Sequence, residues 1–82
     1  MNTVTVRPYL PLDRHSLERL AALDDRRVPD QPVVLAEVDG RLVAALSKRT
    51  GEAVADPFEP TGHLVAMLRY AVNSSSAIRA SS

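Results

Sequence analysis

The stretch PVVLAEVDGRLVAALSKRTG constrains the fold more than any other part of the chain. Asp39–Gly40 stands between two apolar runs, and a two-residue type I′ turn needs positive φ at both central positions, which Asp and Gly tolerate. The stretch therefore predicts a β-hairpin. A two-residue turn sets the expected pairs, which are Val38 with Arg41, Glu37 with Leu42, Ala36 with Val43 and Leu35 with Ala44.

Both faces of this hairpin are apolar. Strict alternation gives one face Val33, Leu35, Leu42, Ala44 and Leu46, with Glu37 near the turn, and gives the other face Val34, Ala36, Val38, Val43 and Ala45. A hairpin with one face in water would alternate apolar and polar residues. We therefore expect both faces to be covered, by helices or by a partner chain.

The flanking segments predict two further strands and two helices. TVTVRPY alternates β-branched residues and predicts a first strand that ends at Pro8. Asp13 is the expected N-cap of an amphipathic helix over 14–25, with its carboxylate accepting from the first free N–H groups. Residues 52–56 predict a short fourth strand. A second helix is expected from Thr61, or from Glu59–Pro60, with the apolar stripe Leu64, Met67, Leu68, Ala71 and Val72.

The expected fold is therefore α/β, more narrowly α+β. It is a four-stranded antiparallel sheet in the order strand, helix, strand, strand, strand, helix, with one helix on each face. The chain has 82 residues and 45% hydrophobic content, enough for one small core. Residues 1–72 form a single domain in this interpretation, and the polar segment 73–82 is expected to be a flexible C-terminal tail.

Composition argues against several classes of function. The chain has no cysteine, which excludes disulfides and thiolate metal sites, and His15 and His63 lie far apart, so no metal site is expected. The formal net charge is zero, whereas a nucleic-acid binder needs a basic surface. No apolar run approaches the roughly 20 residues that span a bilayer, and the first residues lack a signal-peptide pattern. We expect a cytoplasmic protein with no nucleic-acid or membrane partner.

The layout resembles the N-terminal half of the GCN5-related N-acetyltransferase (GNAT) fold over residues 3–72. TVTVRPYLPLDRHSLERLAAL is similar to the first strand and helix of that family. VVLAEVDGRLVAALS is similar to its central hairpin, and VADPFEP to its fourth strand and the proline that often follows. The pattern also resembles that of short, uncharacterised actinobacterial proteins. The resemblance implies either an acyl-CoA-dependent N-acyltransferase or a truncated, non-catalytic module of the same fold.

The stretch FEPTGHL bears on that choice. Working members of the family hold the coenzyme A pyrophosphate on glycine-rich backbone at a helix N-terminus, and Thr61, Gly62 and His63 are the candidate cofactor-binding residues here. Pro60 lacks an N–H donor, and Glu59 adds a negative charge where the anion should sit. We therefore expect no cofactor. Acetyl-CoA belongs to the alternative, in which dimerisation or a second subunit completes an acyltransferase.

Glu37 is the candidate catalytic residue of the hairpin, as a general base near a substrate amine. The simpler interpretation is a partly solvated carboxylate beside the turn, paired with Arg41 or Arg7. No second polar group in the hairpin supports a catalytic site. We therefore expect no catalytic residue.

The expected function is a non-catalytic module that binds itself or another protein. If the family's sheet order holds, the fourth strand is an edge whose backbone can pair with a copy or a partner strand. The candidate interface residues are Val54 on that strand and Leu64, Met67 and Tyr70 on the second helix. We expect a homodimer or a complex with a protein partner through the sheet edge or this helix.

Overall fold

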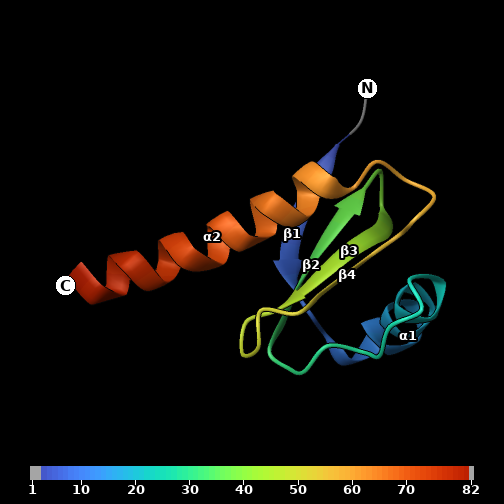
Figure 1. The fold of residues 1–82 in the computed structure, drawn as a ribbon, viewed down its shortest axis with the longest axis horizontal. Coiled ribbons are helices and arrows are strands. Elements are labelled where there is room, and N and C mark those ends of the chain that lie inside the picture. The colour runs from blue at the N-terminus through green and yellow to red at the C-terminus, as the bar shows by residue number, and fades with distance from the viewer. Residues whose placement is uncertain (1–2, 82) are drawn as a thin grey trace.

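The computed structural model describes residues 3–81, with the side chains of residues 3–73 (Figure 1). The elements are β1 (Val4–Pro8), the single-turn 3-10 helix η1 (Pro11–Asp13), α1 (Arg14–Leu23), β2 (Val33–Val38), β3 (Arg41–Ser47), β4 (Ala53–Ala55) and α2 (Gly62–Ser81). The predicted order of elements is confirmed, and so is the four-stranded antiparallel sheet.

The strands pair with their sequence neighbours in the order β1-β2-β3-β4, so β1 and β4 are the edges. The turn between β2 and β3 has φ of 53° at Asp39 and 81° at Gly40, positive at both positions as predicted. Thr3 is hydrogen-bonded to the same turn. Its N–H donates to Asp39 Oδ1 at 2.8 Å, and its carbonyl accepts from the Asp39 N–H at 2.9 Å. The turn therefore anchors β1 as well as the hairpin.

The register of the hairpin shifts by one residue beyond the turn. The observed pairs are Val38–Arg41, Glu37–Leu42, Ala36–Ala44 and Leu35–Ala45. The extra residue is Val43, which forms a β-bulge, and its carbonyl accepts from the N–H of Asp56 at 2.9 Å. The predicted pairs of Ala36 with Val43 and Leu35 with Ala44 are wrong, because simple alternation gives no signal for an inserted residue.

The bulge also exchanges the faces of the residues that follow it. Ala44 and Leu46 pack with Leu68 of α2, whereas Ala45 packs with Leu17 of α1. Alternation had placed Ala44 and Leu46 on the face of Leu35 and Ala45 on the opposite face. These three assignments are wrong, since each residue after the bulge points to the side opposite to the one expected.

Each face of the sheet carries its own helix and its own core, as predicted. On one face the buried residues are Leu17, Leu20 and Ala21 of α1 with Val33, Leu35, Ala45 and Val54 of the sheet. On the other face they are Leu68 of α2 with Ala36, Ala44 and Leu46. Figure 1 shows the two helices on opposite sides of the sheet. The apolar hairpin is therefore covered on both faces within one chain.

The ends of α1 differ from the prediction. Asp13 occupies the N-cap position, but its side chain accepts no hydrogen bond from the first turn of α1. The helix ends at Leu23 rather than Asp25, because Asp25 has a left-handed φ of 52°. The N–H of Arg26 then donates to the carbonyl of Ala21 at 2.9 Å and closes the helix.

α2 begins at Gly62, directly after Thr61, whose carbonyl accepts from the N–H groups of Leu64 and Val65. It continues through Ser81 and runs out beyond the sheet (Figure 1). Its backbone thus extends into the segment 73–82, where the sequence predicts a flexible tail. The flexibility of that segment stays a prediction, and Ser82 and the side chains after Asn73 lie outside the described residues.

Candidate functional site

The loop before α2 uses its own backbone donors. The N–H of Phe58 donates to Asp56 Oδ1 at 2.8 Å, and the N–H of Glu59 donates to the Asp56 carbonyl at 3.2 Å. Pro60 has no N–H. A phosphate cradle needs several free N–H groups that converge on one point. Residues 58–60 therefore offer no free donor to an anion.

An ion pair lies beside this loop. The guanidinium of Arg41, at the start of β3, donates to the carboxylate of Glu59. The sequence shows no Arg or Lys between Arg49 and Arg69, but the fold brings this cation from another strand. Glu59 is therefore neutralised, and the Arg41 guanidinium is engaged by a carboxylate where an anion site would need it free.

Two of the three candidate cofactor residues line a small cavity. Thr61 is buried, whereas Gly62 and His63 are exposed in the first turn of α2. Thr61 and His63 line a cavity of about 130 Å³ together with Val4, Val38, Val43, Glu59, Pro60 and Leu64. Cavities that hold cofactors or drug-sized ligands are usually about 300–1,000 Å³. The cavity at the helix N-terminus is too small for such a ligand.

Glu37 belongs to a closed ionic cluster with Arg7 and Asp13. The Arg7 guanidinium donates to both oxygens of Asp13, at 2.7 and 2.8 Å, and to both oxygens of Glu37, at 3.1 and 3.3 Å. Asp13 Oδ2 also accepts from the N–H of Leu10 at 2.8 Å. Of the two partners that the sequence left open for Glu37, the structure selects Arg7. The cluster ties β1, β2 and η1 together.

The charges of this cluster stabilise one another. Hydrogen bonds from Arg7 lower the pKa of Asp13 to about 2, against the opposing effect of burial. The same contacts raise the pKa of Arg7 above its ordinary value. A general base needs a free lone pair within reach of a substrate proton. Glu37 is bound to Arg7 through both oxygens, and a structural role accounts for its position.

Sequence reasoning missed Asp13 as a member of this cluster. It assigned the carboxylate to the first turn of α1, where capping aspartates are common. The nearest sequence signal lies in the connection from β1, where Pro11, a residue suited to the first position of a helical turn, begins the turn η1 that ends at Asp13. The Leu10–Asp13 hydrogen bond closes that connection.

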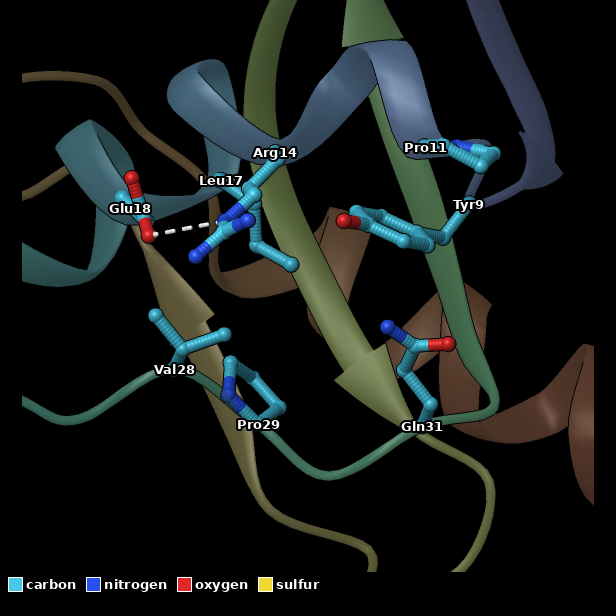
Figure 2. Close-up of a pocket in the computed structure, with 8 residues that line it drawn as sticks. All are labelled: Tyr9, Pro11, Arg14, Leu17, Glu18, Val28, Pro29 and Gln31. Carbon is cyan, nitrogen blue, oxygen red and sulfur yellow. Dashed lines mark hydrogen bonds and ion pairs between the residues drawn. The ribbon is translucent and has the colours of Figure 1, made fainter.

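A larger hollow lies elsewhere, between α1 and the loop before β2. It has a volume of about 490 Å³ (Figure 2). The lining residues are Tyr9, Pro11, Arg14, Leu17, Glu18, Val28, Pro29 and Gln31. Arg14 and Glu18 form an exposed ion pair at its rim, with Nε and Oε2 3.4 Å apart. The hollow combines apolar walls with the phenol of Tyr9 and the amide of Gln31. His15, which is not one of the lining residues, has its Nδ1 3.8 Å from Glu18 Oε1 and is almost fully exposed.

The four candidate interface residues divide into buried and exposed. Val54 and Leu64 are only 2% and 3% exposed, so their side chains belong to the core and cannot meet a partner. Met67 is 38% exposed and Tyr70 is 74% exposed. The part of the predicted side-chain surface that is accessible is therefore on α2.

At the β4 edge, which the sequence predicts to pair with a partner, one outward backbone donor is already used. The N–H of Ser47 donates to the carbonyl of Glu52, and the N–H of Asp56 donates to the carbonyl of Val43. The alternation of an antiparallel ladder therefore points the backbone N–H and C=O of Val54 toward β3 and those of Ala53 and Ala55 outward. The outward N–H of Ala55 donates to Asp24 Oδ2 at 3.1 Å. A carboxylate from the end of α1 thus occupies a donor that an added strand would need.

The β1 edge is open by comparison. Thr3 and Tyr9 bond to β2, at Asp39 and Val33, so the alternation of an antiparallel ladder turns the N–H and C=O groups of Val4 and Val6 away from the sheet. Val4 and Val6 are each 42% exposed. Within the described residues, no protein group occupies these outward donors. β1 therefore presents free backbone beside exposed apolar side chains.

The first turn of α2 lies beside this edge. Val4 lines the small cavity with His63 and Leu64. Met67 and Tyr70 follow at one and two turns from His63 on the same side of the helix. Arg69, on the opposite side, donates to the carbonyl of Gly51 at 2.8 Å. We name the surface formed by Val4, Val6, Met67 and Tyr70 the β1–α2 surface.

Comparison of the chain with models of protein families, with curated proteins and with solved structures gave no match. The resemblance to the GNAT fold therefore stays a prediction. Among the described residues, no helix combines the length and apolar character needed to cross a bilayer. In the same part of the chain, no group of three or more acidic or histidine side chains is placed to hold a metal ion.

Proposed function

We propose that this chain is a non-catalytic, acetyltransferase-like interaction module that acts in the cytoplasm. It binds a protein, either another chain or its own copy, through the β1–α2 surface. The observation that carries the proposal is the contrast between the two sheet edges: an Asp24 carboxylate occupies one of the two outward donors of β4, the N–H of Ala55, whereas the outward groups of Val4 and Val6 are free within the described residues. A free edge with apolar side chains is a common site of strand addition.

The absence of a built catalytic site in the described residues supports the same proposal. Glu37 is held by Arg7, and Glu59 is held by Arg41. The loop donors of Phe58 and Glu59 are used within the loop. The carboxylates of Glu37 and Glu59 are therefore each paired with an arginine and are not directed at a ligand.

The proposal is tested by capture from a lysate of the source cell. The wild-type chain, Val6→Lys and Leu12→Lys are immobilised in parallel, and bound proteins are identified by mass spectrometry. Val6→Lys places a charge in the β1–α2 surface, and Leu12→Lys is the matched control because Leu12 is 80% exposed on η1, away from that surface. We expect a protein that binds wild type and Leu12→Lys but not Val6→Lys. Capture that is equal for all three, or none by any for a chain that also stays monomeric in solution, would contradict the proposal.

The alternative function is an acyl-CoA-dependent N-acyltransferase completed by dimerisation or a second subunit. It is favoured by the exposed first turn of α2, where Gly62 and His63 face solvent and a helix N-terminus attracts anions. Calorimetry with acetyl-CoA separates the two functions. We expect no binding heat. A micromolar dissociation constant that is lost in Gly62→Pro would favour the enzyme and overturn the non-catalytic proposal.

A further inference from the structure

We infer that the partner of the β1–α2 surface is a second copy of this chain. β1 pairs antiparallel with β1 of the copy about a two-fold axis that passes Thr5, and the two four-stranded sheets join into one. The inference rests on the proposed function and specifies its partner. Residues of the copy are marked with a prime below.

The hydrogen bonds of β1 define this register. The outward groups are the N–H and C=O of Val4 and Val6. When Val4 lies opposite Val6′ and Val6 opposite Val4′, each valine exchanges both bonds with its partner. Thr5 then lies opposite Thr5′ in the non-hydrogen-bonded position at the axis. Every outward donor and acceptor of these two residues is satisfied.

Pro8 argues against the neighbouring register. An axis at Val6 would place Val4 opposite Pro8′, which has no N–H to donate to the Val4 carbonyl. With the axis at Thr5, Pro8 falls beyond the Val4–Val6 ladder. The same proline limits a heterologous strand, because a long partner would lose a bond wherever it met Pro8. A short, symmetric partner fits this edge better than a long one.

Charge is compatible with self-pairing in this register. Val4 meets Val6′ on the α2 face, and Thr5 meets Thr5′ on the α1 face, so no charged side chains are opposed at the centre. Arg7 lies opposite Thr3′ and is already bound to Asp13 and Glu37. Like charges directly opposite one another would destabilise a cross-strand pair, whereas threonine pairs are favourable. A two-fold arrangement therefore creates no like-charge contact.

The size of the surface sets the expected strength. A stable dimer buries about 800 Å² per partner. The pairing of one five-residue strand, with two valines that are each 42% exposed, covers less than this. The dimer is therefore reversible, and its population rises with concentration.

Single cysteines test the register, because the natural chain has none. In Thr5→Cys the two sulfur-bearing residues face each other with Cα atoms about 4.5 Å apart, within the range that a disulfide bridges. In Thr3→Cys, the matched exposed control, the two cysteines lie roughly 13 Å apart along the strands. Under mild oxidation we expect Thr5→Cys to become a covalent dimer and Thr3→Cys to stay monomeric. Equal cross-linking of both variants, or none in Thr5→Cys, would overturn the inference.

Sedimentation equilibrium of the wild-type chain gives an independent readout. We expect the average mass to rise with concentration from that of one chain toward that of two, and this rise to be lost in Val6→Lys but kept in Leu12→Lys. A monomer at every concentration would overturn the inference. If that monomer still captured a different protein in a Val6-dependent manner, the proposed function would stand without self-association. Circular dichroism checks that each variant is folded.

Discussion

Replacing Asp13 with asparagine removes one of the two carboxylate charges that surround Arg7 while keeping the shape of the side chain. Asp13 is 5% exposed, and its carboxylate accepts from two nitrogens of Arg7 and from the N–H of Leu10. The amide of asparagine resembles the neutral, protonated carboxyl group. The substitution therefore measures how much the ionised form of Asp13 stabilises the fold.

The expected loss follows from the pKa of Asp13. Its folded value of about 2 lies below the ordinary value because Arg7 donates to the ionised form. The difference corresponds to about 2 kcal/mol of folding free energy at pH 7. A chain of this length has a free energy of unfolding of roughly 4–12 kcal/mol. Asp13→Asn should therefore remove a sizeable share of the stability.

The sign of the pH dependence is fixed by the direction of the shift. A carboxyl group whose folded pKa is lowered contributes its full stabilisation above its unfolded pKa, near 3.9, and loses it as the pH falls toward about 2. Urea denaturation of wild type and Asp13→Asn between pH 7 and pH 2 measures this. We expect a difference of about 2 kcal/mol at pH 7 that nearly disappears at pH 2.

Glu18→Gln is the matched acid-to-amide control. Glu18 pairs with Arg14 on the surface, and its side chain is 47% exposed, so its loss should cost no more than about 0.5 kcal/mol. If Asp13→Asn cost no more than Glu18→Gln at pH 7, the cluster would not stabilise the fold. A difference between wild type and Asp13→Asn that stayed constant down to pH 2 would refute the pKa argument.

Two further substitutions test the core and the turn. Leu68→Ala removes the fully buried side chain that joins α2 to the sheet and should lower the free energy of unfolding by about 2–5 kcal/mol; Met67→Ala, at 38% exposure, should cost clearly less in the same urea titration. Gly40→Ala meets no neighbouring atom, but its φ of 81° should cost about 1–2 kcal/mol. Gly62→Ala, equally unobstructed but without a positive φ, should be neutral or stabilising. Equal costs for the two glycines would refute the strain argument.

The candidate site was only partly predictable from the sequence. The poor fit of Glu59 and Pro60 to an anion cradle is a property of those residues and was evident from the sequence. The partners of the charged side chains could not be predicted from the sequence. Arg7 meets Glu37 thirty positions away, and Arg41 meets Glu59 eighteen positions away. The sequence left Arg41 and Arg7 open as partners of Glu37 and indicated no partner for Glu59, and only the assembled sheet fixes both pairs.

The sequence alone determined the elements and their order, because turn dihedrals and apolar periodicity depend on residues that are close neighbours in the chain. Asp39–Gly40 specified its turn, and the doubly apolar hairpin required a cover on each face. The tertiary structure decided the bulge at Val43, the hydrogen bond of Asp24 to the β4 edge and the exposure of β1. Each of these depends on which backbone groups find partners across the sheet, and hydrogen-bond partners distant in sequence are fixed only when the whole fold is assembled.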